Sequence, residues 1–483
     1  MKHSKTPGRS GFNPSRRKLI AGAAGAMSAL AVPGCGSNGG GGDSGSGGGS
    51  DGNKGLPKPE DSGIDHIVVV MMENRSFDHM FGWVPGANGR QEGLSFPDIN
   101  GDLISTFRLS QDSAYGFQGC NFADPDHGYD GGRIEMAGGA MNGFLLTHGT
   151  SANPGDHFPI GYYTADDLPF YKGAVENWTV CDRYHCGILS STIPNRIYMH
   201  SGQTDRNENM LNQCKLDTIW ARLAAKGRTG RYYAPDLPMT ALWYTKHLNI
   251  TLPFPAFLAD AAAGTLADVT YVDPSFGFSV GEGPGLSKDD HPHADVRDGQ
   301  AFLNTVYDAL RNGPKWDKTL MIINYDEWGG FFDHVVPPFA PVSDDERNNI
   351  APQGNDGRLG FRTPCMLIGP RARKGYVDPQ QWDPNSILNF ICWRFGLDTL
   401  GVRGKTSGNI AQALDFDNAP RTDSPAFTVP LGPFGLPCAN EIPVVGSLAG
   451  LNPVAKSMAM HKLEMQALAN LALRNGFTIG PGF

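Results

Sequence analysis

The 483-residue sequence has no excess of positive charge and no hydrophobic run long enough to cross a bilayer near its start. Its formal net charge is −9, so no general electrostatic attraction draws it to nucleic acid or to an anionic membrane surface. The apolar stretch at residues 21–32 is too short for a transmembrane helix. We therefore expect no nucleic-acid partner, and any phosphate group must be held locally, by a metal ion or by a few cationic side chains.

Cysteine is also scarce, and no repeated CxxC spacing indicates a structural zinc site. The eight cysteines are Cys35, Cys120, Cys181, Cys186, Cys214, Cys365, Cys392 and Cys438. Removal or acylation of Cys35 would leave an odd number, so we expect at least one unpaired thiol. Which cysteines pair does not follow from their spacing.

The N-terminus has the pattern of an export signal. Arg16 and Arg17 directly precede the small, apolar residues 21–32, which is typical of a twin-arginine signal peptide over residues 1–35. Residues 32–35 resemble a lipoprotein cleavage box with Cys35 as the acylated residue, although Pro33 is unusual there; the alternative is a plain cleavage site. We expect an exported protein that is periplasmic, secreted or lipid-anchored.

A tether and one large domain follow the signal. Residues 36–55 are nearly all Gly, Ser, Asn and Asp, a composition that cannot bury enough apolar surface to fold. We assign residues 36–60 to this tether. No comparable linker and no internal repeat occurs after it, so residues 61–483 are predicted to form a single domain.

The domain has the alternating pattern of an α/β protein. Apolar, β-branched runs that end at polar residues are typical of buried parallel strands. We predict strands at 64–72, 319–325 and 363–368, helices at 216–226, 298–312, 385–395 and 453–475, and long loops at 84–160 and 236–297. This order predicts a three-layer sandwich with a mainly parallel central sheet.

Polar side chains follow two of the predicted strands directly. Glu73 and Asn74 come after the first, and the adjacent acids Asp326 and Glu327 come after the second. Ligands bind at the carboxyl ends of the strands in open α/β sheets, and these oxygens suit a divalent cation. The alternatives are a capped turn after the first strand and a solvated acidic turn after the second. Arg75 would pair with a carboxylate or a phosphate.

The segments 73–78 and 326–335 closely resemble those of the phosphoesterase family of bacterial phospholipases C and acid phosphatases, distant relatives of the alkaline phosphatases. The likeness continues through 124–127, 141–144, 161–171, 191–196 and 290–292. It therefore covers most of the chain after the tether, in the family's order, and it implies an alkaline-phosphatase-like fold.

The resemblance implies a divalent cation, calcium or zinc, held by Glu73, Asn74, Asp326 and Glu327. It also implies that Thr192 supplies a nucleophilic hydroxyl and forms a phospho-threonine intermediate. Taken alone, Thr192 would be a helix N-cap or a turn residue.

The remaining site candidates are His127, His291, His334 and Asp290. The histidines match the family's pocket positions, and the sequence does not assign their separate roles. Arg196 would orient the loop after Thr192 or form a structural salt bridge.

The expected function is that of a metal-dependent phospholipase C acting on phosphatidylcholine-type lipids. An acid phosphatase acting on phosphomonoesters and a non-catalytic exported binding lipoprotein are the alternatives. The partner is then a phospholipid or phosphate ester, with peripheral membrane contact through the substrate or a lipid anchor.

A choline head group would favour an aromatic wall, for which the sequence offers several aromatic residues. These are Tyr162, Tyr163, Trp178, Trp243 and Tyr244. One segment departs from the family pattern: many relatives carry Asp-His-Thr-Ser where this chain has residues 383–386, so the histidine is missing and metal number and substrate preference are open.

Overall fold

The computed structural model of the chain describes residues 51–147, 153–278, 283–439, 448 and 450–480. All of them belong to the unit Gly49–Phe483. The predicted signal peptide, Cys35 and the tether up to residue 50 lie outside the described residues. In the part that is described, no helix is both long and apolar enough to cross a membrane.

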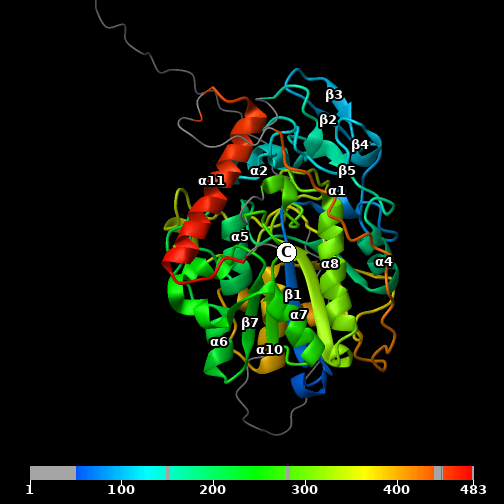
Figure 1. Cartoon of the computed structure of the whole chain (residues 1–483), viewed down its shortest axis with the longest axis vertical. Helices are drawn as coiled ribbons and strands as arrows, with labels where there is room; N and C mark the ends of the chain where they lie inside the picture. Colours follow the sequence, from blue (N-terminus) through cyan, green and yellow to red (C-terminus); the bar gives the residue numbers. More distant parts are fainter. Residues whose placement is uncertain (1–50, 148–152, 279–282, 440–447, 449, 481–483) are drawn as a thin grey trace, which may run out of the picture. The chain divides into compact units, whose positions relative to one another are not determined.

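Helices and strands alternate along most of the chain (Figure 1). The strands are β1 His66–Met72, β2 Ser95–Pro97, β3 Leu103–Ser105, β4 Phe107–Arg108, β5 Gly161–Tyr162, β6 Thr179–Tyr184, β7 Gly230–Ala234, β8 Thr251–Pro253, β9 Val269–Val272, β10 Thr319–Tyr325, β11 Cys365–Ile368 and β12 Tyr376–Trp382. The α-helices are α1 Phe77–Phe81, α2 Tyr129–Met136, α4 Pro169–Asn177, α5 Thr192–Ser201, α6 Ile219–Ala225, α7 Phe254–Ala263, α8 Val296–Arg311, α9 Asp344–Asn348, α10 Pro384–Phe395 and α11 Pro453–Arg474.

Eight strands form the central sheet, in the order β12-β6-β11-β10-β1-β9-β7-β8. All neighbouring pairs are parallel except those of β11, which runs antiparallel to both β10 and β6. In β1 and β10 the apolar side chains are buried along nearly the whole strand, because helices cover both faces of the sheet.

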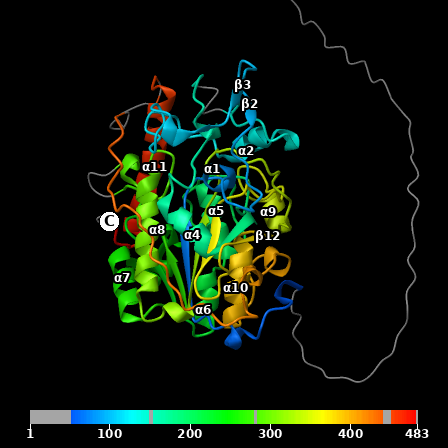
Figure 2. The same cartoon turned by 90° about the vertical axis from the view of Figure 1, so that its right-hand side faces the viewer.

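The helices form a layer on each side of the sheet (Figures 1 and 2). Helices α7 and α8 lie on one side, and α4 packs against α8. Helices α6 and α10 lie on the other side, where α5 contacts both. The predicted α/β sandwich with a mainly parallel sheet is therefore confirmed.

Two details of the predicted fold are wrong. The strand predicted at 363–368 exists as β11, but it is antiparallel; it needs no crossover helix, and the chain returns from β10 through loops and the short α9. The region 236–297 is not one long loop, since it holds a 3₁₀ helix at Met239–Ile250, then β8, α7 and β9. Only four residues make up β9, too few to show a clear period in the sequence.

A disulfide joins two segments of the described chain that are 318 positions apart in the sequence. Cys120 pairs with Cys438, and the five cysteines Cys181, Cys186, Cys214, Cys365 and Cys392 are free and buried. The expectation of at least one unpaired thiol is confirmed. At the other end of the chain, Asn53 and Lys54 accept hydrogen bonds from Asn409 and Gln412, so the last residues assigned to the tether already contact the domain.

Candidate active site

The carboxyl ends of β1 and β10 bring the two acidic segments together. The strands pair in parallel with Met72 opposite Tyr325, so the residues that follow them leave the sheet side by side. The backbone N–H of Asn74 donates to Asp326 Oδ1 at 3.1 Å. Asn74 has a φ of 57°, a left-handed conformation that asparagine tolerates better than most residues. Glu73 and Asn74 therefore meet Asp326 and Glu327 at one edge of the sheet, as predicted, although they lie about 250 positions apart in the sequence. We call these four residues the acidic edge.

Thr192 is the first residue of α5 and points at this edge. Its hydroxyl donates to Glu73 Oε1 at 3.2 Å and lies 3.4 Å from Asn74 Oδ1. The N-cap of α5 is Ser191, so Thr192 is not the helix cap that its sequence position alone favoured. The hydroxyl therefore faces the acidic edge instead of closing the helix.

Arg196, one turn further along α5, lies among the same carboxylates. It is 1% exposed and pairs with Asp326 at 3.0 Å, Asp273 at 3.3 Å and Glu73 at 3.6 Å. The guanidinium balances part of the negative charge that this edge buries. Arg196 was expected either to orient the loop after Thr192 or to form a structural salt bridge, and the structure shows salt bridges.

The buried carboxylates carry more negative charge than Arg196 neutralises. Burial raises the pKa of Glu73 well above its usual value, and repulsion from Asp326 raises it further. Burial also raises the pKa of Glu327 well above its usual value; the charge of His127 opposes this shift, and the charge of Asp326 adds to it. Such crowding favours either a proton or a bound cation.

The donor set fits a divalent cation. Glu73 Oε2 and Glu327 Oε1 are buried oxygens with no hydrogen-bond partner among the described residues. The amide oxygen of Asn74 and the hydroxyl of Thr192 add neutral oxygen donors. Asp326 lies beside them, and both of its oxygens already accept N–H groups, from Asn74, Glu327 and Arg196. Oxygen ligands of this kind suit calcium, while zinc also accepts carboxylates. The side chains predicted as metal ligands are thus all present at the acidic edge.

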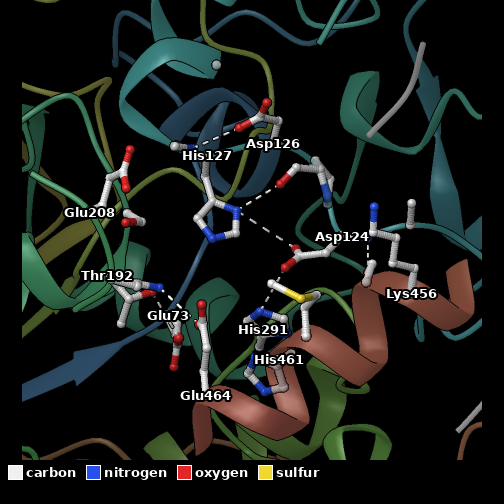
Figure 3. Close-up of a pocket in the computed structure, with 18 of the residues that line it drawn as sticks. Glu73, Asp124, Asp126, His127, Thr192, Glu208, His291, Lys456, His461 and Glu464 are labelled. Carbon is white, nitrogen blue, oxygen red and sulfur yellow. Dashed lines mark hydrogen bonds and ion pairs between the residues drawn. The ribbon is translucent and has the colours of Figure 1, made fainter. Parts of the chain in front are cut away.

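A pocket of about 810 Å³ opens over Thr192 and Glu73. Figure 3 shows His127 on one side of it and His291 with His461 on another. Its wall includes the 124–131 segment and one face of α11. Two of the three predicted histidines, His127 and His291, therefore line the same pocket as the threonine.

His127 is a cation at neutral pH. Burial by itself lowers the pKa of His127, but the charges of Glu327 and Asp124 more than offset this and raise the pKa to about 10. Its Nδ1 lies 2.8 Å from the backbone oxygen of Pro125. A protonated imidazole in this position is suited to contact a phosphate oxygen.

His334 does not reach the pocket. Its Nδ1 lies 2.5 Å from Asp78 Oδ2, and its Nε2 lies 3.2 Å from Asn88 Oδ1. His334, Asp78 and Asp333 could hold a metal ion by geometry, since one ligand atom of each lies within 4.8 Å of the others. However, the buried Arg362 pairs with both aspartates at 3.0 and 3.1 Å.

Every carboxylate oxygen of Asp78 and Asp333 already accepts a hydrogen bond from Arg362 or from a backbone or imidazole N–H. The carboxylates of this cluster are therefore fully hydrogen-bonded without an ion, and the cluster ties α1 to the loop after β10. The predicted contact of His334 with the phosphate or leaving group stays a prediction, and the distance of this residue from the pocket lining does not support it.

Asp290 and Arg75 are also placed away from the pocket. Asp290 Oδ2 accepts a hydrogen bond of 2.5 Å from the hydroxyl of Tyr325. Arg75 donates to the backbone oxygen of Asp290 at 2.6 Å, and its guanidinium lies over the ring of Phe331. Arg75 thus contacts interior groups, and within the described residues it forms no ion pair with a carboxylate. Its expected contact with a phosphate stays a prediction.

The aromatic residues expected around a choline group do not line the pocket. Tyr162, Tyr163, Trp178 and Trp243 are buried elsewhere, and Tyr244 is outside the lining as well. Among the described residues that line the pocket, Tyr129 is the one aromatic residue apart from the histidines, and its ring is covered by the guanidinium of Arg133. The pocket therefore offers no open aromatic cage.

Sequence reasoning missed several pocket residues. Asp124 forms ion pairs with His291 at 3.3 Å and with His127 at 3.9 Å. His461 of α11 stacks on His291 with ring centroids 4.0 Å apart, and Glu464 lies on the same helix face. Asp124 stood in a segment that carried the resemblance, but nothing in the sequence indicated where α11 would lie.

The segment 383–386, which lacks the family's histidine, caps α10. Asp383 and Ser386 form a reciprocal capping box, and Pro384 occupies the first helical position, where its missing N–H costs nothing. It does not line the pocket.

Several known proteins are similar to this chain. A model of a family described as the phosphoesterase family matches residues 64–398. Phospholipase C A of Mycobacterium tuberculosis is 28% identical over 428 residues, covering 76% of this chain and 80% of that protein. Non-specific phospholipase C6 of Arabidopsis thaliana is 30% identical over 401 residues, covering 76% and 75%. Among solved structures, a protein in the alkaline phosphatase superfamily from Vibrio parahaemolyticus is 10% identical with a TM-score of 0.35, covering 63% of this chain and 82% of that chain.

Replacing Gly329 by alanine should disable the acidic edge. Gly329 has a φ of +64°, and an added Cβ would lie 2.2 Å from the backbone oxygen of Asn74. Displacing Asn74 by even about 1 Å should reduce hydrolysis of a phosphate ester by roughly 100-fold. Gly138→Ala is the matched control, because Gly138 has a φ of +66° with nothing within 4 Å of the added carbon. Equal activity of the two variants would contradict the prediction.

Replacing Asp290 by asparagine should stabilise the protein at high pH. Burial raises the pKa of Asp290 to about 7, so the folded protein holds a proton there that the unfolded chain releases near pH 4. The stability that this proton supplies is complete below about pH 4 and is lost as the pH rises through about 7. The melting temperature of Asp290→Asn minus that of wild type should therefore grow between pH 4 and 7 and then level off. A difference independent of pH would refute this.

Proposed function

This chain belongs to the phosphoesterase family and is a phosphoric ester hydrolase, and we propose that it cleaves the phosphodiester of a phospholipid through Thr192. The observation that carries the proposal is the contact of the Thr192 hydroxyl with Glu73 and Asn74 at the floor of the pocket. Relatives named phospholipase C support the phosphodiester of a lipid over a phosphomonoester.

The first step is attack by Thr192 Oγ1 on phosphorus. Glu73 Oε1 already accepts the hydrogen bond of this hydroxyl, so it is placed to take the proton as the new O–P bond forms. Bound by Glu73, Asn74, Asp326 and Glu327, a divalent cation would lower the pKa of the hydroxyl and balance charge on the phosphate.

The bond from phosphorus to the leaving oxygen then breaks, and that oxygen needs a proton. His127 lines the pocket and is protonated at neutral pH, so it can hydrogen-bond a phosphate oxygen or protonate the leaving alcohol. In the second step water attacks phosphorus and gives a proton to His127, the Thr192–phosphorus bond breaks, and Thr192 recovers its proton from Glu73.

The backbone of α5 offers a further donor. The N–H of Ile193 is taken by Asn209 Oδ1 at 2.9 Å, and Pro194 has no N–H. No hydrogen bond of the Thr192 N–H occurs within the described part of the chain. The helix N-terminus therefore presents this N–H, with the positive end of the helix dipole, toward the phosphate.

The head group is the least constrained part of the proposal. Because the pocket has no open aromatic cage, its walls do not favour a trimethylammonium group by cation–π contact. Its outer wall carries the carboxylates Asp126, Asp130 and Glu208 and the amine of Lys456. Assays of the purified protein on phosphatidylcholine, phosphatidylethanolamine and a phosphomonoester would separate a phospholipase C from an acid phosphatase.

Export by the twin-arginine pathway is part of the same proposal. It rests on Arg16, Arg17 and the apolar residues that follow them. The disulfide between Cys120 and Cys438 supports it, because such bonds persist in oxidising compartments. The final location would be periplasmic, secreted or anchored through Cys35, with membrane contact through the anchor or the lipid substrate.

Replacing Thr192 by valine should abolish turnover. Valine has nearly the same shape and lacks the hydroxyl, so we expect a loss of at least about 1,000-fold in kcat with the fold retained. Thr192→Ser, which keeps the hydroxyl, should retain activity and should yield a trapped phospho-serine on rapid acid quenching. Wild-type turnover by the valine variant would remove Thr192 as the nucleophile.

Chelation should remove activity, and a divalent cation should restore it. Because three acidic ligands share the site, Asp326→Asn should weaken binding of the cation by at least about tenfold. Isothermal titration of the apoprotein with calcium or zinc measures this directly, and His334→Gln serves as the control outside the pocket. Unchanged activity in a chelator, after dialysis, would contradict the metal-dependent account.

A further inference from the structure

Helix α11 lies outside the stretch that matches the family model, yet it builds one wall of the active site. The family match ends at residue 398, whereas α11 spans Pro453–Arg474. Figure 3 shows His461 and Glu464 on the face of this helix that turns toward Thr192 and His291. The hydroxyl of Ser457 accepts a hydrogen bond of 2.8 Å from the backbone of Asp124.

The helix that carries the nucleophile needs a cap from elsewhere. Ser191 occupies the N-cap position of α5, but its side chain makes no capping hydrogen bond. Asn209 supplies the cap instead, because its Oδ1 accepts the N–H of Ile193 at 2.9 Å. An N-terminal cap is worth about 1 kcal/mol and fixes the first turn of a helix, and here Thr192 is in that turn.

Glu464 fixes which end of the Asn209 amide faces α5. Its Oε2 accepts a hydrogen bond from Asn209 Nδ2 at 3.2 Å. An amide whose nitrogen donates to a carboxylate must present its oxygen on the other side, toward the N–H of Ile193. Rotation of the amide by half a turn would place the oxygen against Glu464 and lose both bonds.

We propose that Glu464 and Asn209 form a relay by which the C-terminal helix α11 positions the Thr192 nucleophile. Both are positioning residues, since neither needs to touch the reacting phosphate. The relay rests on the proposed role of Thr192, and it assigns to α11 a part in catalysis beyond that of a pocket wall. It predicts a loss in kcat, with KM nearly unchanged, when the relay is broken.

The decisive test exchanges donor and acceptor. Asn209→Asp places two carboxylates 3.2 Å apart and should turn the new side chain away from Ile193. We expect kcat on a soluble phosphodiester to fall by about tenfold, the equivalent of one lost cap and its orientation. In the double variant Asn209→Asp/Glu464→Gln, the glutamine amide donates to the aspartate, which accepts the N–H of Ile193. This variant should recover to within about threefold of wild-type kcat.

Controls separate this from a general loss of stability. Gln466→Ala changes an exposed residue of the same helix and should leave kcat and KM at wild-type values. Glu464→Ala removes the orienting acceptor without adding charge, so it tests the relay even if Asn209→Asp fails to fold. Melting temperatures of all variants, with kcat measured well below them, exclude unfolding as the cause.

Two results would overturn the relay. One is wild-type kcat in folded Asn209→Asp or Glu464→Ala, and the other is a double variant no faster than Asn209→Asp. Thr192→Val, measured alongside, keeps the two proposals apart: if it is inactive while the Asn209 and Glu464 variants are unaffected, only the relay fails. If Thr192→Val is active, the proposed nucleophile itself fails.

Discussion

The parallel pairing of β1 with β10 is the constraint on which the active site depends. With Met72 opposite Tyr325, both strands end at the same height, and the next residues of each must share the space beyond the sheet. A slip of one residue would turn Glu73 or Asp326 to the other face. The apolar side chains that hold the register are buried by the helical layers, so the burial that stabilises the fold also sets the spacing of the acids.

Buried carboxylates this close together repel one another, and two cationic side chains reduce that repulsion. Arg196 supplies one buried positive charge within 3.6 Å of three carboxylates, which lowers the repulsion but does not cancel it. The remaining negative charge draws His127 into its protonated form, which explains why a buried imidazole has a raised pKa. The same carboxylates that favour a divalent cation therefore also favour the protonated form of His127.

The sequence predicted the acidic residues at the strand ends better than the other residues that line the pocket. Glu73, Asn74, Asp326 and Glu327 stood directly after long apolar strands, and such strands carry a strong local signal. Thr192 depended on the family resemblance, because a threonine before Ile-Pro-Asn is otherwise an ordinary helix start. His334 and Asp290 resembled site residues equally well, but their partners, Asp78 and Tyr325, come from other segments that no local pattern connects to them.

The division of the chain also bears on substrate choice. The groups proposed to perform the chemistry lie within residues 64–398, whereas Lys456, Met460 and His461 come from a helix beyond that match. A disulfide from Cys438 to Cys120 ties the segment before this helix to the loop that leads to Asp124 and His127. One wall of the pocket is thus built by a helix that lies beyond the residues matched by the family. Substrate preference is therefore better sought on α11 than at the acidic edge, where any change would alter the chemistry itself.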